Sequence, residues 1–173
     1  GSVLANAVDD IDLPKVGLLN VGSEAIKGND QVKEANILLE SSPLNYIGYV
    51  EGDDIFCGDV DVIACDGFVG NVSLKTSEGV AKLISSYAKQ SFTKNLYTKL
   101  IALLATPILK EFKNSIDPRR YNGASLLGLQ GIVIKSHGGA DAFSFAHAIS
   151  IAHIEAKKGV STLIDKQLEN YLA

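Results

Sequence analysis

The sequence predicts an α/β protein with a mostly parallel sheet covered by helices. Short apolar runs of strand length recur along the chain, and segments with apolar residues at three- and four-residue spacing separate them. Glycine-containing polar loops connect several of the predicted strands to the helices that follow. This alternation of strands and helices is typical of parallel sheets with helices on their faces.

The first half of the chain contains three of the expected strands. The apolar run 16–21 predicts a buried strand, and the runs 45–50 and 60–65 predict the second and third. Between the first two strands, apolar residues at helical spacing over 32–39 indicate a helix that Pro43 ends. A short acidic segment before the third strand predicts a single turn of helix.

Helices dominate the second half. A long helical segment is expected over 72–118, broken or kinked at Pro107 because proline disrupts a helix interior. The run 131–135 predicts a fourth strand, and further helices are expected over about 140–157 and 160–172. Four strands make a small sheet, which indicates part of a larger fold.

Composition limits the function. The chain has a net charge of -4, whereas nucleic-acid binding usually needs a strongly basic face. No apolar run approaches the about 20 residues of a membrane-spanning helix. Cys57 and Cys65 have apolar neighbours and no CxxC spacing, so we expect buried thiols and a reducing, cytoplasmic setting. A polar, acidic stretch, 6–12, precedes the first strand.

Three glycine-containing loops follow predicted strands and lead into helices, on one edge of the predicted sheet. Ligands of parallel sheets bind at the carboxyl ends of strands, and helix N-termini favour anions. The loops therefore predict a site for phosphate or an oxyanion. The candidate residues are Lys27, Gly28 and Asn29 in the first loop, Asp66, Gly67, Gly70 and Asn71 in the second, and Ser136, His137 and Gly138 in the third.

These residues also have structural interpretations. Glycine after a strand often serves turn geometry alone, Lys27 can be a solvated lysine, and Asp66 and Asn71 can be helix caps. His147 and His153 lie about 120° apart on one predicted helix, so structural roles are favoured. No metal-binding arrangement such as HExxH and no GxSxG nucleophile elbow occurs, so we expect no metal and no covalent nucleophile.

Three longer runs, 17–29, 66–79 and 122–141, are similar in order to motifs of the phosphate acyltransferase family. The resemblance implies a dimeric enzyme that moves a fatty acyl group from acyl carrier protein to inorganic phosphate, giving acyl phosphate for phospholipid synthesis without a cofactor. It also implies a three-layer α/β/α fold similar to the isocitrate and isopropylmalate dehydrogenases. Carried over to this chain, Lys27 and Asn29 would bind phosphate or stabilise the thioester oxyanion, and Asp66, Gly67, Asn71 and His137 would line the same cleft.

Members of this family are longer, with an N-terminal half that begins with an Asp-Ala-Met-Gly-Gly-Asp-type motif. Residues 1–173 therefore resemble the C-terminal portion of one phosphate acyltransferase domain. Two alternatives stay open. One is a phosphate acetyltransferase-like enzyme that uses acyl-coenzyme A, and the other is a non-catalytic fragment that binds anions and dimerises.

The segment 89–120 is basic and amphipathic within an otherwise acidic chain. It carries seven basic residues against two acidic ones, and its leucines form an apolar stripe at helical spacing. Such a segment suits an anionic membrane surface or an acidic carrier protein. The alternative is a hairpin that packs on a second subunit. We expect a helical arm over 72–120, with peripheral membrane contact through 89–120.

Overall fold

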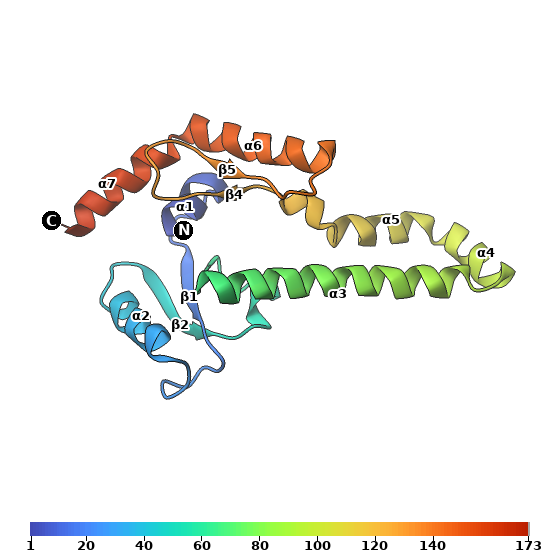
Figure 1. The fold of residues 1–173 in the computed structure, drawn as a ribbon, viewed down its shortest axis with the longest axis horizontal. Helices are drawn as coiled ribbons and strands as arrows, with labels where there is room; N and C mark the ends of the chain where they lie inside the picture. The colour runs from blue at the N-terminus through green and yellow to red at the C-terminus, as the bar shows by residue number, and fades with distance from the viewer. Residues whose placement is uncertain (173) are drawn as a thin grey trace.

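The computed structural model describes residues 1–172, apart from the side chains of Pro118, Tyr171 and Leu172 (Figure 1). It contains a small parallel sheet of three strands, a separate two-stranded sheet and many helices. The predicted α/β class is therefore confirmed.

The parallel sheet has the strand order β2-β1-β3. Its central strand, β1 (Lys15–Leu19), pairs in parallel with β2 (Asn45–Val50) and with β3 (Val62–Ala64). Val16 and Leu18 are buried, as expected for a strand paired on both sides. These strands confirm the three predicted in the first half of the chain, and all three end at the same edge of the sheet.

Helix α2 (Asp30–Glu40) packs against β1 and β2. Its N-cap is Asn29, whose side chain accepts a hydrogen bond from the backbone N–H of Val32 at 2.9 Å. The helix ends before Pro43, as predicted. The short acidic turn before β3 is the 3-10 helix η1 (Asp54–Phe56).

The prediction that Cys57 and Cys65 are buried is wrong, because both thiols are exposed. Cys57 ends η1 in the connection between β2 and β3, and Cys65 follows β3. Since β3 is an edge strand of the described sheet, its end is not enclosed by a further strand.

The predicted fourth strand lies outside the parallel sheet, which corrects the expected topology. It is the short strand β5 (Ile134–Lys135), and it pairs antiparallel with β4 (Ala124–Ser125). A local hairpin needs only a short loop closure, whereas joining a distant parallel sheet requires a long crossover. Ser125 also donates a hydrogen bond to the buried carboxylate of Glu155, which ties the hairpin to α6 (Ala142–Lys158).

The polar opening of the chain, for which no element was predicted, contains α1 (Ser2–Asp9). It packs against α6 and against α7 (Val160–Leu172), and its buried residues are alanines. Asp10 ends it in the left-handed conformation and pairs with Lys158 at 2.7 Å. Helices α6 and α7 match the two expected near the C-terminus, and Gly159, at φ 63°, separates them.

Three helices form the projecting part of the molecule. Helix α3 (Gly67–Thr93) extends away from the sheet, and α4 (Leu96–Leu104) and α5 (Thr106–Ser115) return beside it (Figure 1). The 3-10 helix η2 (Pro118–Tyr121) then leads to the hairpin and α6. Pro107 lies in the first turn of α5, so the predicted break is confirmed. Among the described residues, no helix is long and apolar enough to span a membrane.

Candidate functional site

The parallel sheet brings two of the three predicted loops to one edge. The loop 22–29 follows β1, and Asp66 lies just beyond the neighbouring strand β3. Because both strands run in the same direction, their loops leave the sheet on the same side. This arrangement is the usual setting for a ligand site in a parallel sheet.

Lys27 provides a positive charge at this edge. Its Nζ lies 2.6 Å from Oε2 of Glu24, and its side chain is 44% exposed. The hydrogen bond with Glu24 raises the pKa of Lys27, and the same bond lowers the pKa of Glu24. A lysine nucleophile needs a lowered pKa, so the Lys27 ammonium is suited to bind or stabilise an anion instead.

Asn20 fixes the loop that carries Lys27, and the sequence analysis did not identify it. It is buried at the end of β1, its side-chain Nδ2 donates to the carbonyl oxygen of Lys27 at 3.3 Å, and its Oδ1 accepts from the N–H of Val21. Gly28 has a φ of 90°, and a Cβ there would lie 2.4 Å from Asn20 Oδ1. Glycine is therefore required both for the backbone conformation and for the space.

The side-chain oxygen of Asn29, Oδ1, accepts the hydrogen bond that caps α2, which leaves its side-chain NH₂ as a donor. Asn29 and Lys27 thus place an amide donor and an ammonium two residues apart, at the start of α2. Donors of these kinds suit phosphate or a thioester oxyanion.

The second loop is mostly helix, which corrects two expectations. Helix α3 begins at Gly67, so Gly67, Gly70 and Asn71 lie in its first turns, and Asn71 is not a cap. The cap is Asp66, whose Oδ1 accepts from the N–H groups of Phe68 and Val69 at 2.9 and 3.3 Å. These two N–H groups therefore already have a hydrogen-bond partner.

The third loop lies away from the sheet edge. It follows β5 in the two-stranded sheet, and His137 Nε2 lies 3.0 Å from Nζ of Lys75 on α3. Lys75 is eight residues beyond Gly67, or about 12 Å along the helix axis. Within the described part of the chain, no hydrogen bond or ion pair joins His137 to loop 22–29. The expectation of three loops on one sheet edge is therefore wrong.

Asn122 positions this third loop and was also missed from the sequence. It is buried, and its Nδ2 donates to the Ser136 hydroxyl at 2.9 Å and to the Ser144 carbonyl oxygen at 2.8 Å. Its Oδ1 accepts the backbone N–H of His137 at 2.9 Å. One buried amide thus holds both Ser136 and His137, while Gly138 and the imidazole stay exposed.

Arg119 joins η2 to the start of α6. Its guanidinium contacts Asp117 at 2.7 Å and Asp141 at 2.8 Å. Asp141 also caps α6 by accepting from the N–H and the hydroxyl of Ser144. The pKa of Asp141 is lowered to about 2, most strongly by the hydrogen bond from the backbone N–H of Ser144, then by the bonds from the Ser144 hydroxyl and from Arg119. Its carboxylate therefore stays ionised at neutral pH.

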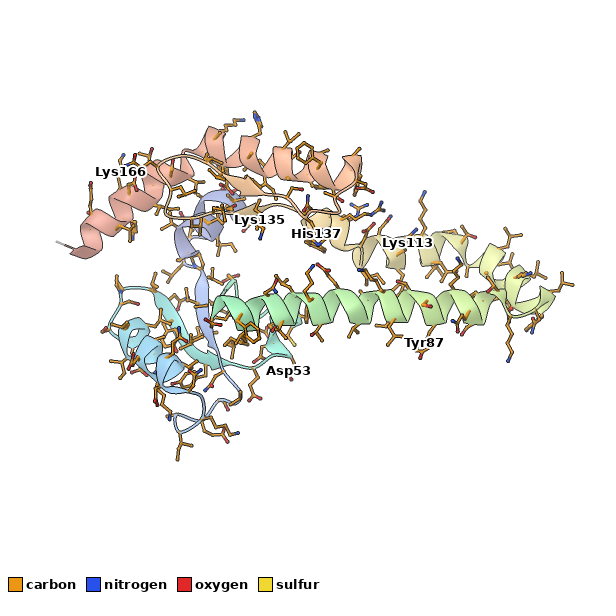
Figure 2. The ribbon with its side chains drawn as sticks, viewed as in Figure 1. Asp53, Tyr87, Lys113, Lys135, His137 and Lys166 are labelled. Carbon is orange, nitrogen blue, oxygen red and sulfur yellow. The ribbon has the colours of Figure 1, made fainter. Side chains whose placement is uncertain are left out.

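A basic cleft lies between α3 and the segment from α5 to η2. Its volume is about 540 Å³, and its lining residues include the basic side chains Lys82, Lys89, Lys113 and Arg119 against the single acid Asp117. Figure 2 shows His137 above α3, with Lys113 farther along towards the end of the arm. Among the described residues, the three lysines form no ion pair. The cleft is therefore suited to anions.

The two other histidines, His147 and His153, form no hydrogen bond or ion pair with the candidate site residues among the described residues. His147 packs edge-on against Phe143, with ring centroids 4.8 Å apart, and His153 is exposed on α6. No group of three or more metal-binding side chains lies together among the described residues.

Comparison with known proteins gives a consistent family. A family described as fatty acid synthesis protein matches residues 1–163. The chain is 61% identical to a phosphate acyltransferase of Alkalilimnicola ehrlichii over 173 residues, which is all of this chain and 51% of that protein. It is 59% identical to the phosphate acyltransferase of Nitrosococcus oceani, with the same shares covered. For that of Legionella pneumophila (strain Corby), the identity is 56% over 99% of this chain and 51% of the relative. The chain thus spans about half the length of the curated relatives it matches.

Proposed function

We propose, from the premise that this chain belongs to the phosphate acyltransferase family, that it contributes part of an active site that transfers a fatty acyl group from acyl carrier protein to inorganic phosphate. The observation that carries the proposal is the position of the Lys27 ammonium and the donor amide of Asn29, two residues apart in the loop that follows β1. The product is acyl phosphate, which serves phospholipid synthesis. The remainder of the site comes from the half that the relatives carry in addition.

The proposed reaction needs only binding and electrostatic stabilisation from these residues. A phosphate oxygen attacks the thioester carbonyl carbon, so a C–O bond forms and negative charge develops on the carbonyl oxygen. The C–S bond then breaks, and the carrier thiolate takes the proton that the phosphate releases. Lys27 and Asn29 stabilise the oxyanion or hold the phosphate. Because phosphate is itself the nucleophile, no covalent enzyme intermediate is required.

Glu24 acts as an internal counter-ion in this proposal. It holds the Lys27 ammonium at 2.6 Å in the free protein, and an incoming phosphate competes with it. Gly28, Asp66, Gly67, Gly70 and Asn71 shape the loop and the helix start around the substrate. This part of the proposal is supported by the position of these residues, which follow β1 and β3 in the chain.

We further propose that the complete fold is the three-layer α/β/α sandwich of the isocitrate and isopropylmalate dehydrogenase type, with residues 1–173 as its C-terminal portion. The three-stranded sheet supports this, since both of its outer strands have a free edge within the described residues. Exposed apolar side chains beside the sheet, including Leu13, Ile37 and Phe56, offer surface for the remaining half.

The helical arm, formed by α3, α4 and α5, has features that suit a second subunit and a membrane surface. In α4, Leu96, Leu100, Leu103 and Leu104 are each more than half exposed, and they form the apolar stripe predicted from the sequence. We propose that this arm takes part in a homodimer and that its tip contacts the membrane, which would place a cytoplasmic enzyme where its hydrophobic product is used. Lys94 and Lys99 flank the stripe and favour an anionic surface.

Replacing Leu103 and Leu104 together with glutamate is expected to lower binding to anionic vesicles by at least about tenfold, because two exposed leucines that would insert into the membrane surface become negative charges. Co-sedimentation with the vesicles measures the effect. The control is Leu168→Glu, an exposed leucine of α7. Equal binding of the double variant and the unchanged chain would remove the arm tip as the membrane contact.

Two alternatives are separated by their substrates. A phosphate acetyltransferase-like enzyme would consume acyl-coenzyme A with phosphate, whereas the proposed enzyme consumes acyl carrier protein thioester. A non-catalytic fragment would bind phosphate, raise its melting temperature and dimerise, but consume neither thioester. Both comparisons require a complete protein, for which a chimaera is suitable: this chain in place of the matching half of the Alkalilimnicola ehrlichii relative.

A further inference from the structure

The contact between Lys75 and His137 has more hydrogen-bond donors than acceptors. Nζ of Lys75 lies 3.0 Å from Nε2 of His137, and the backbone N–H of Gly139 points at Nδ1 of the same ring at 3.1 Å. An ammonium and a backbone N–H can only donate, and a neutral imidazole has a single acceptor nitrogen. If Nδ1 accepts from Gly139, then Nε2 carries the proton, and two donors face each other.

The surroundings do not supply an acceptor between the two groups. Glu78 is one helical turn from Lys75 and pairs with it at 3.0 Å, but no hydrogen bond joins Glu78 to His137 among the described residues. The Lys75 side chain is 51% exposed, and the imidazole is exposed as well. An anion from solvent can therefore reach both donors.

Two features fix the pair in place, and a third connects it to the basic cleft. Asn122 accepts the backbone N–H of His137, so the ring is anchored to a buried amide. Lys75 lies in the interior of the 27-residue helix α3. Lys82 lies seven residues, or about two turns, beyond Lys75, on nearly the same side of α3, and it lines the basic cleft. The positive charge of the cleft thus continues towards the pair.

We propose that Lys75 and His137 form a phosphate-binding site, in which one phosphate oxygen accepts from both Nζ and Nε2–H. This inference rests on the proposed function and extends it, because it assigns phosphate recognition to a lysine in the interior of α3, about 12 Å from the helix start. The ligand is inorganic phosphate or a phosphodiester of a larger substrate, since both present the same kind of oxygen. Glu78 is the counter-ion that the phosphate displaces.

The test is phosphate binding to variants with opposite expected effects. Lys75→Ala is expected to weaken binding of inorganic phosphate at least about tenfold, because a charge-assisted hydrogen bond is lost. Glu78→Gln is expected to strengthen it about threefold, because the competing carboxylate is removed. A merely structural role for the ion pair predicts no gain in affinity for Glu78→Gln. Calorimetric titration measures both variants, and Lys166→Ala, an exposed lysine of α7, is the matched lysine control.

The ring nitrogens of His137 give a second readout that needs no substitution. Phosphate is expected to shift the nitrogen resonance of Nε2 in the unchanged chain, and chloride at the same ionic strength is not. Dimethyl phosphate as a second titrant separates the sources: a matching shift favours a phosphodiester, and a shift with inorganic phosphate alone favours the free ion. If neither compound moves the Nε2 resonance, the site does not exist.

Lys27→Ala in the same titrations separates this inference from the proposed function. Loss of phosphate binding in Lys27→Ala with normal binding in Lys75→Ala would overturn the Lys75–His137 site and leave the sheet-edge site standing. Normal phosphate shifts at His137 in a complete protein without acyl transfer would contradict the proposed function and leave this site standing.

Discussion

Replacing Lys27 with alanine is expected to lower the rate of acyl transfer to phosphate by about 100- to 1,000-fold, the usual effect of removing one donor from an oxyanion site. The physical reason is its charge: a lysine side chain is an ammonium at neutral pH, and the hydrogen bond to Glu24 raises the pKa of Lys27 further. The measurement is the single-turnover rate of the chimaera with acyl carrier protein thioester at saturating phosphate.

Two further variants give this prediction its controls. Lys33→Ala removes a lysine from the adjacent helix α2, and its rate should stay within about threefold of the unchanged protein, as for a surface substitution. Glu24→Gln keeps the ammonium but removes its counter-ion, so phosphate affinity should rise while turnover persists. Full activity of Lys27→Ala would mean that the sheet-edge loop does not carry the chemistry.

Replacing Asn122 with alanine is expected to lower the free energy of unfolding by about 3 kcal/mol, because it leaves buried polar groups without partners. The side chain makes three hydrogen bonds, to Ser136, to the Ser144 carbonyl and from the His137 N–H, and it is only 8% exposed. Urea unfolding followed by circular dichroism measures the change.

The comparison variants for Asn122 test its geometry. Asn122→Asp keeps the acceptor for the His137 N–H but loses both donated bonds, so its loss of stability should also be large. Asn114→Ala, an exposed asparagine of α5, should change the unfolding free energy by less than about 0.5 kcal/mol. A loss below about 1 kcal/mol for Asn122→Ala would show that the hairpin and α6 are held together by other contacts.

The elements that could be predicted from the sequence are those with a local signal. The strands 15–19 and 45–50 are apolar runs, and α2 and α6 have helical spacing and clear ends at Asn29 and Gly159. The break at Pro107 is equally local. Each of these patterns depends only on neighbouring residues, so it can be recognised without knowledge of distant contacts.

The elements that were missed depend on tertiary contacts. Helix α1 is short and is stabilised by packing of its alanines against α6 and α7, which its own sequence does not reveal. The two-residue strand β5 resembles a strand of the main sheet in composition, but its partner is the nearby β4. Pairing partners of such short apolar runs cannot be deduced from periodicity.

The candidate site was predictable only where its residues are neighbours in the sequence. Lys27 and Asn29 lie in a loop whose motif is contiguous, whereas Lys75 in a helix interior has the appearance of a solvated side chain. Its partner His137 is 62 residues away. Asn122 gave a faint signal, since it precedes a glycine at the start of the third motif, but its partners come from the loop after β5 and from α6.

The most direct test of the central claim is phosphate-dependent loss of an acyl carrier protein thioester, catalysed by the chimaera of this chain with the additional half of the Alkalilimnicola ehrlichii relative. The account predicts that thioester loss requires phosphate, yields acyl phosphate in equal amount and disappears in Lys27→Ala. A folded chimaera that leaves the thioester intact at saturating phosphate, or that consumes it equally fast without phosphate, would contradict the account.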